Sequence, residues 1–185
     1  MPALVGCTST NTTDSPHLRF DIAAFEDFEG EFDAGSFGSV EGDLDYSSFR
    51  VGVGILQRDA ETARPIGRAE LALGFANFED EFGDGFDGFE LAGGGRYFLG
   101  ASDRVLPYLS AYAVSTFFDD FAGVDFGTQF GVAFGAGVEI ATGSHFSFDA
   151  GVDYLIPLVP GETDPGAIDV EVDGLAIRAG VVIDL

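Results

Sequence analysis

The chain has 185 residues, a formal net charge of −24 and 46% hydrophobic residues. This length suits one domain with a sizeable core, and so high an apolar content argues against a disordered acidic chain. All eight basic residues are Arg. Because phosphate binding needs clustered cations, we expect no nucleic-acid partner. The sequence has no run of about 18 apolar residues, so it predicts no transmembrane helix.

The single cysteine, Cys7, ends the segment Leu-Val-Gly-Cys and precedes a polar, Thr-rich stretch. This segment resembles the lipobox of bacterial lipoproteins, which implies that Cys7 is lipidated. It departs from that pattern because the leader before the cysteine is very short, with no charged or apolar region. Two interpretations stay open: a signal peptide precedes the printed start, or Cys7 is an inert thiol. In both, residues 1–16 form a flexible tail and residues 17–185 the folded domain.

From residue 17 onward, apolar residues recur with a period of two between turn residues, which predicts β-strands. Most connections are too short for crossover helices, so the strands form consecutive antiparallel hairpins. Eight such strands can close into an up-and-down barrel, which removes the exposed sheet edges. The expected strands are residues 17–27, 45–56, 66–78, 87–99, 106–118, 126–141, 146–158 and 175–185.

The two faces of these strands differ in composition. In seven strands, one face is apolar and carries no charge, whereas the other combines charges with many Gly and Ala. The strand at 106–118 is ambiguous, because Tyr108 and Tyr112 oppose Leu109 and Ala111. The outer wall of a soluble barrel has no reason to favour Gly, but the narrow interior of an eight-stranded barrel needs small side chains. We therefore expect a filled polar interior and a lipid-facing apolar wall.

Charges inside such a barrel must pair, and Arg and carboxylates occur in near balance on the polar face. We expect an interior charge network with the following members: Arg19, Asp21, Arg50, Arg68, Glu70, Glu90, Arg96, Glu139, Asp149, Asp153 and Arg178.

The connections also differ between the two ends of the barrel. Both termini of an even-stranded outer-membrane barrel are periplasmic, and its outer loops are longer than its inner turns. Outer loops are then expected at 28–44, 79–86, 119–125 and 159–172, and inner turns at 57–65, 100–105 and 142–144. The outer loops contain many acids and no basic residue, whereas Arg58, Arg64 and Arg104 fall in inner turns. The Phe residues of 78–90 are expected at the membrane interface.

With these features, residues 17–185 resemble the small eight-stranded outer-membrane barrels of the OmpA, OmpX and OmpW type. The most specific element is the C-terminal segment Arg178-x-Gly180-x-x-Ile183-x-Leu185. It is similar to the insertion signal of outer-membrane proteins, although the last residue of that signal is usually aromatic. The resemblance implies a place in the outer membrane of a Gram-negative bacterium, with the lipid bilayer and the barrel-insertion machinery as partners.

No catalytic site is predicted. His17 and His145 fall at the inner end and are expected to be ordinary turn residues, so we expect no enzyme activity and no cofactor. Acids of the second outer loop make divalent cations a candidate partner at the outer rim, although the spacing does not match an EF-hand. These acids are Asp80, Glu81, Asp84 and Asp87.

The preferred interpretation is a non-enzymatic outer-membrane barrel with a structural or surface-interaction role through acidic, Phe-bearing outer loops. One alternative is a soluble barrel of the lipocalin kind, in which the apolar face would line a ligand cavity. Another is a narrow passive channel.

Overall fold

Nine β-strands make up the regular structure of the part of the chain that the computed structural model describes. That part comprises residues 12–33, 39–80, 85–100, 102, 104–118, 127–143, 145–162 and 169–185. No helix in these segments is long and apolar enough to cross a membrane. The strands are β1 (Thr12–Asp33), β2 (Ser39–Asp59), β3 (Pro65–Asp80), β4 (Gly85–Phe98), β5 (Val105–Phe118), β6 (Thr128–Ala141), β7 (Phe146–Val159), β8 (Gly161–Glu162) and β9 (Asp169–Asp184).

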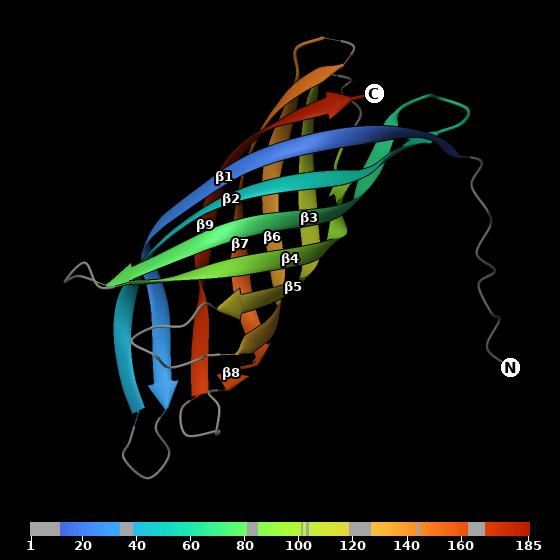
Figure 1. The fold of residues 1–185 in the computed structure, drawn as a ribbon. Helices are drawn as coiled ribbons and strands as arrows, with labels where there is room; N and C mark the ends of the chain where they lie inside the picture. Colours follow the sequence, from blue (N-terminus) through green and yellow to red (C-terminus); the bar gives the residue numbers. More distant parts are fainter. Residues whose placement is uncertain are drawn as a thin grey trace, which may run out of the picture.

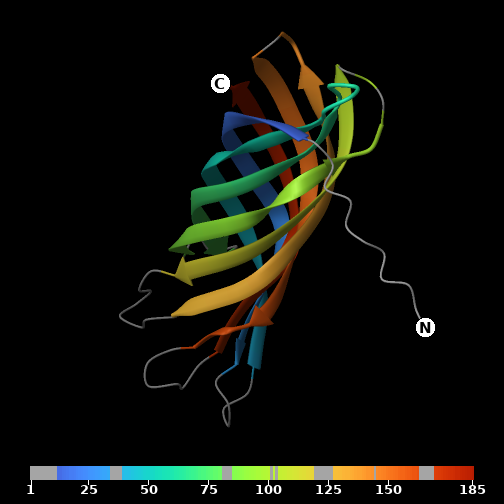
Figure 2. The same cartoon turned by 90° about the vertical axis from the view of Figure 1, so that its right-hand side faces the viewer.

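The strands form one antiparallel sheet that closes on itself (Figures 1 and 2). Neighbours in sequence pair from β1 to β7, β7 pairs with β9, and β9 pairs back with β1. The two-residue β8 only extends the edge of β9 at Val170. The predicted eight-stranded antiparallel up-and-down barrel is therefore confirmed.

The ends of the strands differ from the prediction. β1 begins at Thr12, which pairs with Asp59, so the barrel starts before the expected boundary at His17. The predicted outer loop at 28–44 is wrong over most of its length, because β1 runs to Asp33 and β2 starts at Ser39. β9 likewise starts at Asp169, within the expected loop at 159–172. Main-chain hydrogen bonds hold these extensions as strands even where no apolar alternation marks them.

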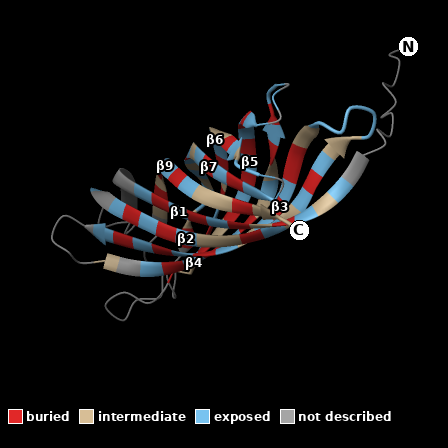
Figure 3. Cartoon of the chain, turned by 90° about the horizontal axis from the view of Figure 1, so that it is seen from above, coloured by how far each residue is buried: buried red, intermediate tan, exposed pale blue. Residues whose placement is uncertain are grey.

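Burial alternates along the strands, as the red and pale blue bands of Figure 3 show. No position on the predicted apolar face is buried; Ile22, Leu71 and Ile177 are more than half exposed. The opposite face is largely buried and carries the charged residues. The lipocalin-like alternative is therefore wrong, because the apolar side chains form the outside and not the lining of a cavity.

The ambiguous strand β5 follows the same rule. Tyr108 and Tyr112 are buried in the interior, whereas Leu109 and Ala111 point outward. Phe78 also points inward, at 1% exposure, so its expected position at the membrane interface is wrong. It lies on the same side of β3 as Ala76, which period-two alternation requires.

Candidate functional site: a charged interior and an amphipathic outer rim

Arg19 on β1 forms the centre of the interior network. It donates from Nε to Asp21 Oδ1 and from Nη1 to Glu70 Oε2, both at 2.7 Å. Tyr112 donates its hydroxyl to the same Glu70 oxygen at 2.5 Å. Asp149 Oδ1 lies 3.6 Å from Arg19 Nη2. All five side chains are buried. Each charge has thus lost its water and is compensated by these neighbours.

Arg178 on β9 holds a second group of acids. Its Nη1 pairs with Asp153 Oδ2, its Nη2 donates to the Tyr108 hydroxyl at 2.8 Å, and its Nε lies 3.5 Å from Asp149 Oδ1. Ser110 donates to the other oxygen of Asp153 at 3.0 Å. One guanidinium therefore compensates two carboxylates from the same strand, β7.

Arg96 on β4 joins these two groups. Its Nη1 donates to Asp149 Oδ2 at 2.6 Å, and its Nε lies 3.6 Å from Glu70 Oε2. The guanidinium carbon also lies 4.7 Å from the centre of the Tyr108 ring, within the range of a cation–π contact. The charges of these two groups thus form one connected network and not isolated pairs.

Two further arginines pair with acids nearer the ends of the barrel. Near the inner end, Arg68 donates from Nε and Nη2 to both oxygens of Glu139 at 3.0 and 2.7 Å, and from Nη1 to Asp184 at 2.7 Å. Such a fork on one carboxylate is among the stronger ion-pair geometries. Toward the outer end, Arg50 donates from Nε to Glu90 at 2.9 Å.

The two histidines lie in different environments. His17 is within β1 and only 1% exposed, and its Nε2 lies 3.1 Å from Glu70 Oε1. The expectation that it is an ordinary turn residue is therefore wrong. A Cβ on the facing Gly54 would lie 2.6 Å from His17 Cε1, so the glycine makes room for the ring. His145 is exposed in an inner turn, with its Nδ1 3.2 Å from the carbonyl oxygen of Asp184.

Several inward glycines have a steric reason. A Cβ on Gly135 would collide with the Asp153 carboxylate, and one on Gly180 with the Asp21 carboxylate. A Cβ on Gly151 would lie 2.7 Å from the Tyr108 hydroxyl oxygen. The small residues of the polar face thus provide the space that the charged and phenolic side chains fill.

Apolar clusters lie on both sides of the charge network. Toward the outer end, the Phe78 ring lies 5.2 Å from that of Tyr46 and 5.8 Å from that of Phe118, centre to centre. Toward the inner end, a second cluster contains Leu56, Phe98, Leu106 and Tyr108. Buried apolar side chains thus occupy the described interior on both sides of the charge network, which does not favour the alternative of a passive channel.

The structure places every expected network member on the inward face. They comprise five Arg and six acids, and all are buried except Arg50, whose side chain is 15% exposed. Of the insertion signal, Gly180 points inward, whereas Ile183 and the exposed Leu185 lie on the wall side at the end of β9. Cys7 lies outside the described residues.

The interior also contains partners that the sequence analysis missed. Tyr46, Tyr108 and Tyr112 act as hydrogen-bonding groups between Arg and carboxylates. Gln129 exchanges two hydrogen bonds of 2.8 Å with the backbone N–H and C=O of Val172. All four lie at inward positions of their strands. Alternation indicated this side for Tyr46 and Gln129 and left it open for Tyr108 and Tyr112, and it identified none of their partners.

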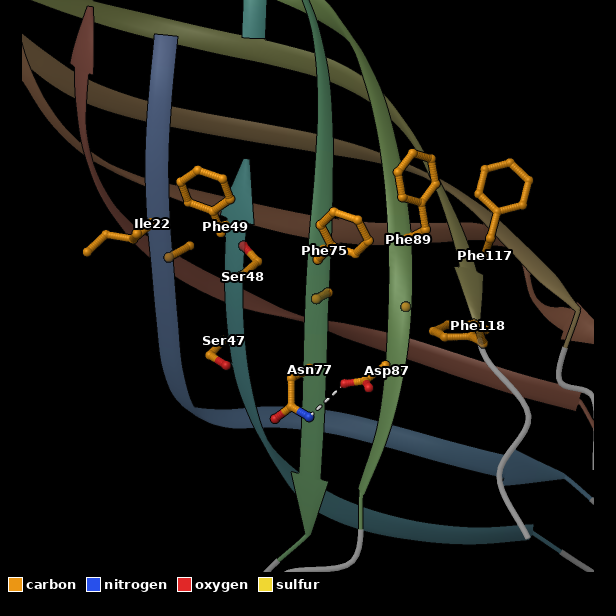
Figure 4. Close-up of a pocket in the computed structure, with 13 residues that line it drawn as sticks. Ile22, Ser47, Ser48, Phe49, Phe75, Asn77, Asp87, Phe89, Phe117 and Phe118 are labelled. Carbon is orange, nitrogen blue, oxygen red and sulfur yellow. Dashed lines mark hydrogen bonds between the residues drawn. The ribbon is translucent and has the colours of Figure 1, made fainter. Parts of the chain in front are cut away.

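Near the outer end of the barrel, the outward-facing residues change abruptly from apolar to polar. Ile22, Phe49, Phe75, Phe89 and Phe117 are paired successively across β1 to β5 and form one continuous row. At the next outward-facing position toward the outer end, β2, β3 and β4 carry Ser47, Asn77 and Asp87, which are also paired across the strands. Asn77 donates to Asp87 Oδ1 at 3.0 Å, as the dashed line in Figure 4 shows. An aromatic row followed at once by a polar row is typical of a membrane interface.

Most of the expected cation-binding acids fall outside the part of the chain that the structure describes. Glu81 and Asp84 lie outside the described residues, as does the side chain of Asp80. Among the side chains that are described, no group of three or more His, Cys, Asp or Glu could hold a metal ion.

At the inner end, Asp59 organises the turn between β2 and β3. Its Oδ1 accepts hydrogen bonds from the backbone N–H of Thr62 at 2.8 Å and of Glu61 at 3.1 Å, and from the Thr62 hydroxyl at 2.9 Å. These donors favour the ionised carboxylate and lower the pKa of Asp59 below its usual value of 3.8.

Two solved structures share this architecture. Neisserial surface protein A is 20% identical, with a TM-score of 0.55, and the match covers 94% of this chain and 99% of that one. The outer membrane protein OprG from Pseudomonas aeruginosa is 15% identical, with a TM-score of 0.58, and the match covers 93% and 95%. At these identities the likeness concerns the fold, and it confirms the expected resemblance to small outer-membrane barrels at that level. No family model and no curated protein matches the sequence.

Proposed function

We propose that the chain is a β-barrel of the outer membrane of a Gram-negative bacterium. The observation that carries the proposal is the inverted distribution of polarity: apolar side chains cover the outside, and paired charges fill the interior. In water, such a surface would expose far more contiguous apolar area than a soluble monomer tolerates. One of the two proteins with a similar fold, OprG, is an outer membrane protein, which supports the same conclusion.

The height of the apolar wall agrees with a membrane span. On β2, outward residues between Ser47 and Gln57 are all apolar, from Phe49 to Ile55. The polar residues that flank this stretch, Ser47 and Gln57, are ten residue steps apart along the strand. At about 3.4 Å per step and a tilt of about 45° they lie about 24 Å apart in height, and the apolar band of outer-membrane barrels is about 25 Å tall.

Within that membrane, we propose a non-enzymatic role in structure or surface interaction through the acidic, Phe-bearing outer loops. Most interior charged side chains are paired with one another, and His17 Nε2 lies 3.1 Å from Glu70 Oε1, which supports a structural role for the interior. The lipid bilayer is the first partner, and the Gly180, Ile183 and Leu185 segment is our candidate signal for the barrel-insertion machinery. Diffuse binding of divalent cations at the outer rim and lipidation of Cys7 are further parts of the proposal.

The mobility of the unboiled and boiled protein on an SDS gel tests the proposal. A closed barrel held by this many buried ion pairs stays folded in cold detergent, so the extracted protein should migrate differently before and after heating. A protein that remains in solution without detergent and shows no heat-dependent shift would contradict the membrane assignment.

A further inference from the structure

An open groove of about 830 Å³ crosses β1 to β5 at the outer edge of the apolar wall (Figure 4). One bank is the row of Ile22 and four Phe rings, and the other is formed by Ser47, Asn77 and Asp87. The floor between the banks consists mainly of small inward-facing residues: Ala23, Ser48, Ala76 and Gly88. The groove therefore offers aromatic surface on its membrane side and oxygen atoms on its water side.

The aromatic bank presents several rings to one ligand. Phe75 is 69% exposed, and its ring centre lies 5.6 Å from that of Phe89 at an interplanar angle of 72°. Phe89 in turn lies 6.2 Å from Phe117 at 44°. Tilted neighbours of this kind turn both edges and faces toward the groove, and ring faces attract organic cations, quaternary ammonium above all.

The polar bank has a negative charge and no positive one. Asp87 is exposed, and its carboxylate is oriented by the amide of Asn77. None of the groove's lining residues is Arg or Lys. The eight Arg of the chain lie in the interior or at inner turns, and the net charge is −24. An anionic headgroup would be repelled at this place, whereas a cationic one would be attracted.

We propose that this groove binds cationic amphiphiles. The positive headgroup lies between the Asp87 carboxylate and the Phe rings, and the apolar tail follows the aromatic row into the bilayer. This inference rests on the proposed membrane orientation, because that orientation places the aromatic bank in the apolar band and Asp87 just outside it. Only a ligand that has both a cationic headgroup and an apolar tail can contact both banks at once.

The test is a titration of the ¹⁵N-labelled full-length protein in dodecyl maltoside micelles, which carry no charge. Tetradecyltrimethylammonium is the cationic probe, and an alkyl glucoside of equal chain length is the neutral control. We expect saturable amide shifts around Phe75 and Asp87 with the cation, and no saturable shifts there with the glucoside. Phe75→Leu, which retains an apolar side chain but removes the ring, should weaken binding of the cation severalfold.

The decisive comparison is between two isosteric variants, Asp87→Asn and Asp173→Asn. Asp173 lies outside the groove on β9, where it accepts a 3.0 Å hydrogen bond from the Tyr154 hydroxyl. Both changes remove one negative charge from a carboxylate that accepts a side-chain hydrogen bond, Asp87 being exposed and Asp173 half-buried, so their effect on overall charge is equal. Asp87→Asn should weaken binding of the cation about tenfold, equivalent to about 1.4 kcal/mol, and Asp173→Asn should have little effect.

Equal losses in the two variants would mean that the cation responds only to overall charge, which would overturn the proposal. If the glucoside gives the same saturable shifts, the groove binds alkyl chains without regard to the charge of the headgroup, and this result would also overturn the proposal. An SDS gel of each variant, unboiled and boiled, keeps these results distinct from a failure of the membrane-barrel assignment, since that failure removes the heat-dependent shift from every variant and from the parent chain.

Discussion

Replacing Arg178 by Met is the most direct test of the interior network. Arg178 is 2% exposed and contacts Asp153, Asp149 and Tyr108. Met is unbranched, uncharged and only moderately smaller in volume than Arg, so the change removes the cation without opening a large cavity. Asp149 retains its 2.6 Å bond from Arg96, which leaves Asp153 as the acid that loses its main partner.

Removing one partner of a buried ion pair costs about 3–5 kcal/mol. Because only one carboxylate is stranded here, we expect a loss of about 3 kcal/mol, at the lower end of that range. Unfolding in urea of the barrel refolded in uncharged micelles, followed by circular dichroism and extrapolated linearly to zero denaturant, measures this loss.

Two further variants serve as controls for this measurement. The exposed Arg64 lies in an inner turn, so Arg64→Met should change stability by about 0.5 kcal/mol or less. Adding Asp153→Asn to Arg178→Met removes the stranded charge and should recover part of the loss. If Arg178→Met costs no more than Arg64→Met, the interior is solvated and the reasoning about buried pairs is wrong.

Three further predictions concern sterics, the outer wall and an inner turn. Gly135→Ala forces a Cβ against the Asp153 carboxylate and should cost about 1–3 kcal/mol; in the same urea assay Gly143→Ala, where the Cβ meets open space, should be nearly neutral. Leu73→Arg on the exposed wall should destabilise the barrel by about 2–4 kcal/mol in lipid vesicles, and a cost near zero would contradict a lipid-facing wall. Asp59, with its lowered pKa, stabilises the fold above its ordinary pKa, and this contribution is lost as pH falls through the lowered value; an NMR titration should place its midpoint below 3.8.

Period-two alternation was sufficient to predict the fold because it reports where a strand meets two different environments. Alternation failed to predict strand ends where the two faces of a strand no longer differ in environment. β1 and β2 continue past the apolar wall through pairs such as Glu31 with Glu41. Main-chain pairing there does not depend on an apolar face. The acidic and Gly-rich residues therefore predict a loop, although they form paired strands.

The inward side of β5 could not be assigned from composition because Tyr suits both faces. Its ring is apolar enough for a wall, but its hydroxyl needs a partner when buried. The structure supplies that partner: Tyr112 donates to Glu70, and Tyr108 to Asp149 at 3.2 Å. Which groups meet across the barrel depends on the stagger of all eight strands, and no local pattern in the sequence encodes that stagger.

The distribution of contacts indicates where the barrel can act. Arg, carboxylate and Tyr side chains of the described interior bind mainly one another, and apolar clusters lie beyond them toward both ends. A ligand entering there would have to displace charge-assisted hydrogen bonds whose partners would then be stranded, at a cost of several kcal/mol for each. The exposed outer edge carries no such penalty, because the side chains of Phe75 and Asp87 are already exposed there. Recognition by this protein is therefore expected at its outer edge, with the interior serving to keep that edge rigid.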